Sequence, residues 1–91
     1  MPTTITHVTV KNFDTWREVF DELYDVRQEF GCYEERIWHN VDDRNKVTIL
    51  MEWDDAEGPR GYMESPEFKA ISPERAGWVG QPVSYILADA D

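Results

Sequence analysis

His7 and His39 are the two histidines of this chain, and histidine is the side chain that gains or loses a proton near neutral pH. His7 lies in an extended stretch between apolar neighbours. If it faces a pocket, its imidazole can take a proton from a phenol or stabilise a developing anion. The alternative is a structural histidine, bonded to a backbone carbonyl or exposed near the chain start. His39, beside Asn40 on a strand of mixed character, is expected at a surface or a subunit interface.

The spacing of potential ligands argues against a metal site. Cys32 and the two histidines lie far apart, without a histidine pair four residues apart or a CxxC spacing, and the carboxylates are scattered. Haem ligation by a histidine lacks the clustered ligands and the basic residues that propionates require. The glycines at 58–61 and 77–80 do not have the spacing of a nucleotide-binding loop. We therefore predict no metal and no bound cofactor.

Aromatic side chains are the strongest indication of a binding site. Four Trp, four Tyr and four Phe are many large side chains for a small interior, so some are expected at a pocket or an interface. If they converge between a sheet and its helices, a flat apolar ligand can stack there. The plainer alternative is that they only fill the core. The candidate ligand-binding residues are Trp16, Phe20, Trp53, Tyr62 and Phe68.

The elements that must position these residues follow from hydrophobic periodicity. Within Ile5–Phe20 the apolar period changes from two to about 3.6, which predicts a short strand leading into an amphipathic helix. The apolar stripe of that helix continues to Phe30, and Gly31 supplies a left-handed stop. The order β-α-β-β-α-β is completed by a strand-rich block at Cys32–Asp54, a broken helical block at Ala56–Gly77 and a strand near Val83–Leu87.

Two of these blocks carry finer signals. The strand Lys46–Trp53 has the strongest apolar pattern and is predicted to be central. The mixed strand Cys32–Val41 is predicted at an edge or facing a polar interface. Ser65-Pro66 and Ser72-Pro73 each resemble an N-cap followed by proline at the first helical position, which predicts two or three short helices. Such a segmented helix is either a mobile wall over a pocket or a bend around the sheet.

Length and charge limit the classes of protein and partner. A chain of 91 residues is expected to form a single domain, residues 1–91, that is marginally stable alone and gains from a partner subunit. The net charge of −10 disfavours nucleic acid and anionic membranes, and reflects either solubility or a salt-rich habitat. A lone cysteine fits a reducing compartment, and the pattern of the first residues leads us to expect neither a leader nor a membrane-spanning run. We expect a soluble, cytoplasmic protein.

Four segments carry a resemblance to a known family: FDTWREVFD at Phe13–Asp21, DDRNKVTILMEWDD at Asp42–Asp55, SPEFK at Ser65–Lys69 and GWVGQPVSYIL at Gly77–Leu87. With these segments the chain resembles the dimeric α/β-barrel superfamily, in the neighbourhood of the antibiotic biosynthesis monooxygenase domain proteins. The resemblance implies a ferredoxin-like α+β fold, with a four-stranded antiparallel sheet that has helices on one face. It also implies that two such sheets pair into a barrel in a homodimer.

The resemblance also implies a small set of possible activities. Similar proteins include cofactor-free oxygenases, haem-degrading enzymes and cyclases. The position of His7 resembles that of a first-strand histidine in short relatives. We therefore expect a homodimer that binds an aromatic or polyketide-like molecule between sheet and helices and acts as a cofactor-independent monooxygenase, with His7 as the base. The alternatives are a non-catalytic ligand-binding or structural dimer, and a cyclase of polyketide type.

Overall fold

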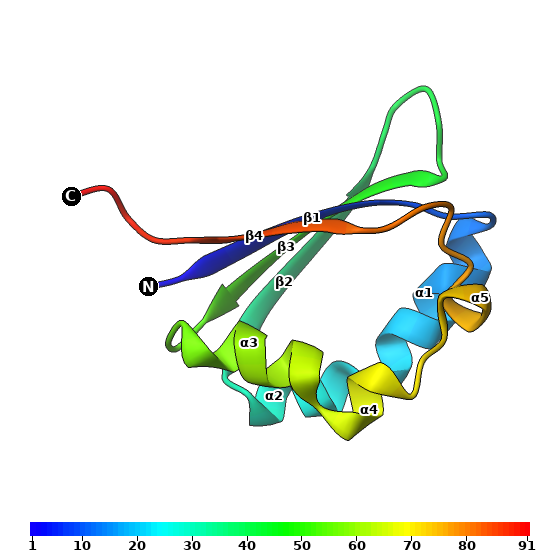
Figure 1. Ribbon diagram of the computed structural model, residues 1–91. Helices are drawn as coiled ribbons and strands as arrows, with labels where there is room; N and C mark the ends of the chain where they lie inside the picture. Colours follow the sequence, from blue (N-terminus) through cyan, green and yellow to red (C-terminus); the bar gives the residue numbers. More distant parts are fainter.

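The computed structural model describes residues 1–91 and confirms the expected ferredoxin-like α+β fold. The four strands form one antiparallel sheet in the order β2-β3-β1-β4. All of the helices cover the same face of this sheet (Figure 1). The strands are β1 (Thr3–Thr9), β2 (Cys32–His39), β3 (Lys46–Trp53) and β4 (Val83–Leu87). The helices are α1 (Phe13–Glu22), α2 (Tyr24–Glu29), α3 (Glu57–Glu64), α4 (Pro66–Lys69) and α5 (Pro73–Ala76).

The first helical stretch ends at Gly31 as its sequence predicts, but it is divided in the middle. Asn12 caps α1, its side-chain oxygen accepting the Thr15 N–H at 3.0 Å, and Gly31 has a φ of 94° after α2. The single helix expected up to Phe30 is instead two helices that meet at Leu23. At this point the Phe20 carbonyl accepts both the Leu23 N–H at 3.2 Å and the Arg27 Nη1–H at 3.0 Å. A side-chain donor therefore competes for the carbonyl that would otherwise continue the helical ladder.

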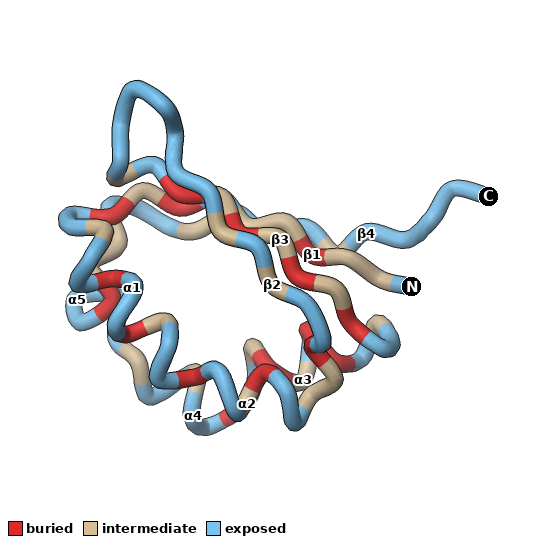
Figure 2. Tube along the Cα trace, turned by 180° about the vertical axis from the view of Figure 1, so that it is seen from behind, coloured by how far each residue is buried: buried red, intermediate tan, exposed pale blue.

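The predicted positions of β2 and β3 in the sheet are confirmed. β3 lies inside the sheet between β2 and β1, and its alternate residues are buried against the helices, whereas β2 forms an edge. The buried residues of β3 are Val47, Ile49, Met51 and Trp53. Figure 2 shows this contrast, since buried positions run along β1 and β3 and β2 is largely exposed. The core is therefore centred on the two inner strands.

The broken helical block forms the three short helices α3, α4 and α5. The hydroxyl of Ser65 accepts the Phe68 N–H at 3.2 Å, and that of Ser72 accepts the Arg75 N–H at 3.0 Å, so both predicted N-caps are confirmed. The proline that follows each serine occupies the start of the helix. None of the five helices has the length and hydropathy needed to cross a membrane.

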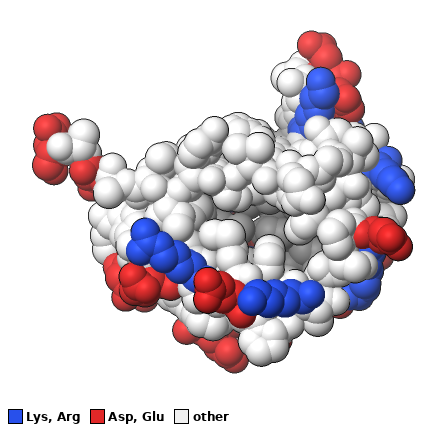
Figure 3. Space-filling model, in the orientation of Figure 1, with Lys and Arg blue, Asp and Glu red and all other residues white.

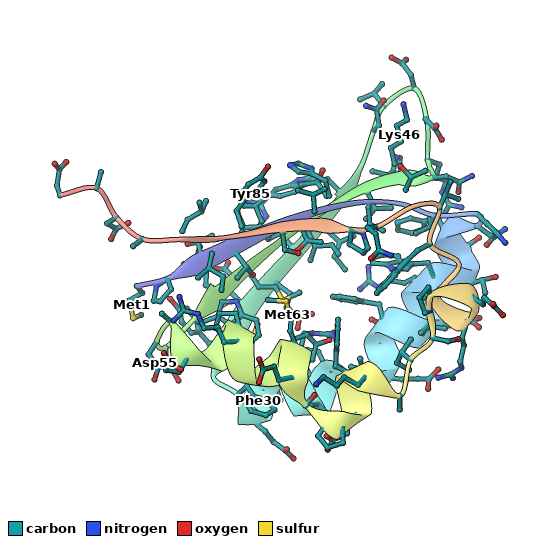
Figure 4. The ribbon with its side chains drawn as sticks, viewed as in Figure 1. Met1, Phe30, Lys46, Asp55, Met63 and Tyr85 are labelled. Carbon is teal, nitrogen blue, oxygen red and sulfur yellow. The ribbon has the colours of Figure 1, made fainter.

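The sheet has one covered face and one open face. Strand register places one set of alternating residues away from the helices, and we call the surface that they form the open sheet face. Figure 4 shows Tyr85 on this outer side and Met63 between the sheet and the helices. Large apolar side chains are exposed there, with Trp38 at 41% and Tyr85 at 54%. The apolar residues of the open sheet face are Ile5, Trp38, Leu50, Val83, Tyr85 and Leu87.

Candidate functional site

A cavity of about 100 Å³ lies between the covered face of the sheet and the helices, and its lining is mostly hydrophobic. Strands β1, β3 and β4 supply one wall, through residues such as Val8, Ile49 and Ser84, and the helices supply the other. Figure 3 shows a hollow on this side of the molecule, surrounded by uncharged atoms, with charged side chains along the helices below it. The cavity is therefore an apolar space that opens toward solvent.

Four of the five aromatic residues predicted to bind a ligand line this cavity: Trp16, Phe20, Tyr62 and Phe68. Trp16 and Phe20 stack with their ring centroids 5.0 Å apart, and Tyr62 and Phe68 meet edge to face at 5.1 Å. Two aromatic pairs, one from α1 and one from α3 and α4, thus contribute to the helical wall. The arrangement suits a flat apolar molecule placed against their rings.

Trp53 is placed differently from the other four. Its side chain is 1% exposed and does not line the cavity. Its indole Nε1–H donates to the Thr4 Oγ1 at 3.0 Å, which satisfies its polar atom within the core. Trp53 supports the site from behind, because its ring lies 5.9 Å from that of Tyr62.

A few of the residues that line the cavity carry polar groups. The Thr6 and Ser84 hydroxyls lie 2.8 Å apart across β1 and β4. The Tyr62 hydroxyl accepts the Nη1–H of Arg27 at 3.2 Å. Burial raises the pKa of the Tyr62 phenol, and the positive Arg27 guanidinium offsets part of that rise. Tyr62 is therefore a neutral hydrogen-bonding group at physiological pH.

Arg27 is the residue that sequence reasoning did not assign to the site. Its side chain is 0% exposed and forms an ion pair with Glu35 of β2, whose side chain is 15% exposed. Its guanidinium carbon also lies 3.7 Å above the centroid of the Phe20 ring. An arginine in the apolar stripe of the first helical stretch was the available signal, because a charged residue at a core position needs a buried partner.

His7 does not face the cavity, contrary to the condition on which its role as a base was predicted. It pairs with Thr48 and Val83 in the register of the sheet, on the open sheet face, and its Nδ1 lies 3.0 Å from the Thr48 Oγ1. The reason is the strict alternation of β1, which turns Thr6 and Val8 inward and the residue between them outward. The imidazole of His7 therefore lies on the other side of the sheet from the cavity. Its role as a base stays a prediction, which the variant His7→Ala tests.

His39 also lies away from the cavity, at the exposed end of β2. Its Nδ1 is 3.0 Å from the carbonyl oxygen of Asn40, and both histidines border a shallow hollow near Trp38. No three His, Cys, Asp or Glu side chains come close enough together to hold a metal ion.

The architecture is shared with solved structures. A crystal structure of an antibiotic biosynthesis monooxygenase superimposes with a TM-score of 0.78 at 18% identity, over 100% of both chains. SnoaB, a cofactor-independent oxygenase from Streptomyces nogalater, gives a TM-score of 0.80 at 14% identity, over 99% of this chain and 93% of SnoaB. A conserved protein from Methanosarcina mazei gives 0.77 at 18%, over 94% of this chain and 89% of that one. At these identities the likeness establishes the fold.

The sequence itself supplies the family. None of the curated proteins matches the sequence. The family model described as antibiotic biosynthesis monooxygenase matches residues 3–74, which include every helix and strand up to the start of α5. The chain therefore belongs to the antibiotic biosynthesis monooxygenase family.

Proposed function

We propose that this protein binds an aromatic or polyketide-like molecule in the cavity between sheet and helices and oxygenates it without a bound cofactor. The observation that carries the proposal is the apolar cavity with the aromatic pairs Trp16–Phe20 and Tyr62–Phe68. An engineered cavity of about 150 Å³ holds benzene. The cavity here is smaller, at about 100 Å³, but it opens to solvent, so we expect it to take one ring only partly enclosed, with the rest of the ligand extending through the opening.

The proposed chemistry uses the electrons of the substrate. Loss of a proton from a phenol or an activated ring carbon gives an anion that is electron-rich enough to reduce dioxygen. A ring CH₂ then becomes C=O while one dioxygen is consumed and one water is released, so no external reductant is needed. The protein contributes an apolar surrounding for the ring and hydrogen-bond donors for the developing anion.

We further propose that two copies of the chain pair through the open sheet face. Six apolar residues lie on this face, with Trp38, Val83, Tyr85 and Leu87 each more than 40% exposed. Exposed apolar side chains gathered on one flat surface favour contact with a protein partner. The face of a second copy offers the matching surface, as a two-fold symmetric interface requires.

A second candidate function, binding without catalysis, is favoured by one observation. The cavity lining contains no His, Asp, Glu or Lys, so no residue there is suited to act as a base near neutral pH. Under this alternative the protein sequesters its ligand. Under the oxygenase proposal the substrate must ionise in water or at the cavity opening before it reacts.

Hydroquinone separates these candidates, because it is a single ring with two ionisable oxygens. Monooxygenation consumes one dioxygen and yields hydroxybenzoquinone and water, whereas simple oxidation yields benzoquinone and hydrogen peroxide. For monooxygenation we expect protein-dependent oxygen uptake in an oxygen electrode. Added catalase should return no oxygen, because no hydrogen peroxide is formed, and the product made under ¹⁸O₂ should carry one ¹⁸O atom. Calorimetric binding without such uptake would support the non-catalytic candidate, and absence of binding would contradict both.

The control variant fills the cavity. Ala76 is buried and lines it, so Ala76→Leu should place extra carbon atoms in the space that the ring requires. Ala70→Leu adds the same atoms at an exposed position after α4. We expect Ala76→Leu to abolish both binding and uptake and Ala70→Leu to leave them unchanged. Equal behaviour of the two variants would place the reaction elsewhere on the molecule.

A further inference from the structure

We propose that Arg27, paired with Glu35, is a positioning residue that orients the Tyr62 hydroxyl so that its proton is donated to an anionic oxygen of the ligand. Resting on the function proposed above, this assignment narrows the ligand class to aromatic molecules ionised at oxygen, that is, phenolates and enolates. The elements involved are α2 for the arginine, β2 for the glutamate and α3 for the tyrosine.

The hydrogen bonds of Arg27 locate the Tyr62 hydroxyl. One nitrogen, Nη1, donates both to the Phe20 carbonyl at 3.0 Å and to the Tyr62 hydroxyl at 3.2 Å. Phe20 and Tyr62 both line the cavity, whereas Arg27 does not. The hydroxyl is therefore held close to Phe20, beside the part of the cavity that these two residues line.

The direction of the Tyr62 proton follows from the chemistry of its partner. A guanidinium has only donors, so the Tyr62 oxygen must be the acceptor in that hydrogen bond. The phenol proton is then available to another acceptor, and no carbonyl or side chain of the protein accepts it. Tyr62 is 5% exposed, and a buried donor without an acceptor is costly. A ligand oxygen in the cavity would supply the acceptor.

The ion pair makes this orientation rigid. Glu35 accepts from both Nε and Nη2 of Arg27, the second bond being 3.3 Å long, and this fixes the plane of the guanidinium. The Phe20 ring packs against the same group at 3.7 Å. A donor held in this way loses little freedom when the ligand arrives. The positive charge near the phenol oxygen also strengthens its O–H as a donor.

A purely structural role for Arg27 makes a different prediction. If the arginine only pins α2 to β2, its removal changes stability but not the choice between ligands. If it positions the Tyr62 hydroxyl, the preference for an ionised oxygen disappears while binding of an uncharged ring persists. Selectivity between two ligands of similar shape is therefore the required readout.

The probes are 4-nitrophenol, at a pH where it is ionised in water, and 4-nitrotoluene, which replaces the oxygen with a methyl group. Binding of each to the full chain is measured by calorimetry, and the visible absorption of bound nitrophenolate reports its hydrogen bonding. We expect the parent chain to prefer nitrophenolate. Tyr62→Phe should weaken nitrophenolate by about tenfold to a hundredfold, the range for one hydrogen bond to a charged group, and change nitrotoluene less than about twofold.

The matched control is Tyr24→Phe, because the Tyr24 hydroxyl bonds Gln28 on an exposed surface outside the cavity. It should change neither affinity. An equal loss of both probes in Tyr62→Phe, or no loss of nitrophenolate, would overturn the proposal. A parent chain that binds nitrotoluene without preferring nitrophenolate overturns it too, while leaving the proposed function intact. A parent chain that binds neither probe overturns both.

Arg27 is tested with Glu35 removed as well, because a largely buried carboxylate left without its partner would strongly destabilise the chain and obscure any change in ligand binding. The double variant Arg27→Met with Glu35→Leu keeps the side-chain volumes and removes both charges. We expect it to bind nitrotoluene like the parent chain, to lose the preference for nitrophenolate, and to shift the absorption of the bound anion toward that of Tyr62→Phe. A double variant that keeps the preference would leave Arg27 a structural residue and overturn its positioning role.

Discussion

The two faces of the sheet are built from the same alternating strands and yet end in opposite states. On the covered face the polar groups are paired, as with Arg27 and Glu35 or Trp53 and Thr4, and the space left over is an apolar cavity. On the open sheet face, apolar side chains such as Tyr85 are exposed and His7 lies among them. One face is therefore suited to a small molecule and the other to a protein surface.

This difference shows why the two chemically interesting parts of the chain are separated. The aromatic residues of the helices can only reach the covered face, whereas a histidine in β1 reaches whichever face its register assigns. His7 is one residue away from Thr6 and Val8, which line the cavity, and that single step places it on the opposite side. If the two faces are as independent as their geometry indicates, a substitution on one face should leave the properties of the other unchanged.

The largest effect is expected at the buried ion pair of the covered face. Arg27→Met leaves Glu35 without its partner and should lower the free energy of unfolding by about 3–5 kcal/mol, measured by urea denaturation followed by tryptophan fluorescence. Arg17→Met is the control, because its ion pair with Asp21 is about half exposed and should contribute less than about 1 kcal/mol. Similar losses in the two variants would mean that burial does not distinguish these pairs.

The second prediction concerns the thiol at the edge of the covered face. Burial, reinforced by the nearby Glu35 carboxylate, raises the pKa of Cys32 to about 11. At pH 8 about one thiol in a thousand is then ionised, against about one in ten for a free cysteine with a pKa of 9.0. Alkylation by iodoacetamide should be at least about a hundredfold slower in the folded chain than in urea. Equal rates would show that the edge opens readily.

The raised pKa of the same thiol makes the free energy of unfolding depend on pH in the alkaline range. The folded chain retains the Cys32 proton where the unfolded chain, with a pKa near 9.0, has released it. The contribution of the protonated Cys32 thiol to the free energy of unfolding is therefore fully present below about pH 9, and it is lost as the pH rises through about 11. Cys32→Ala should remove this part of the alkaline loss of stability, measured by urea denaturation at several pH values.

The third prediction tests the open sheet face. Trp38→Glu places a charge on the apolar surface proposed to pair two copies, and should raise the dimer dissociation constant by about 30-fold or more, as for a central interface residue. Sedimentation velocity or native mass spectrometry measures this. Val41→Glu is the control, since Val41 is 96% exposed in the loop beyond β2. A parent chain that stays monomeric at micromolar concentration would contradict the pairing.

The smallest effect is expected for His7→Ala. Because His7 does not line the cavity, hydroquinone binding and oxygen uptake should stay within about twofold of the parent chain. An unchanged rate of oxygen uptake in His7→Ala would show that the open sheet face takes no part in the reaction. A loss of turnover of about a hundredfold, the low end for a general base, would return His7 to the mechanism and join the two faces into one site.

Much of the fold was predictable because its signals are local. The change of period within Ile5–Phe20, the serine caps before Pro66 and Pro73, and the apolar alternation of β3 each depend on neighbours within a few residues. The site was predictable in part for the same reason. Trp16 and Phe20 are four residues apart, a spacing that places two side chains on the same face of a helix, and both line the cavity.

The sequence by itself determined the four strands, the order of strands and helical blocks, and which stripe of the first helical stretch is apolar. The tertiary structure alone decided which face of β1 meets the helices, because β-branched residues occur on both of its faces and alternation cannot choose between them. It also decided that Trp53 is core and that Arg27 meets Tyr62, 35 residues away along the chain. Such contacts depend on how separate elements pack, and no local pattern of residues encodes that packing.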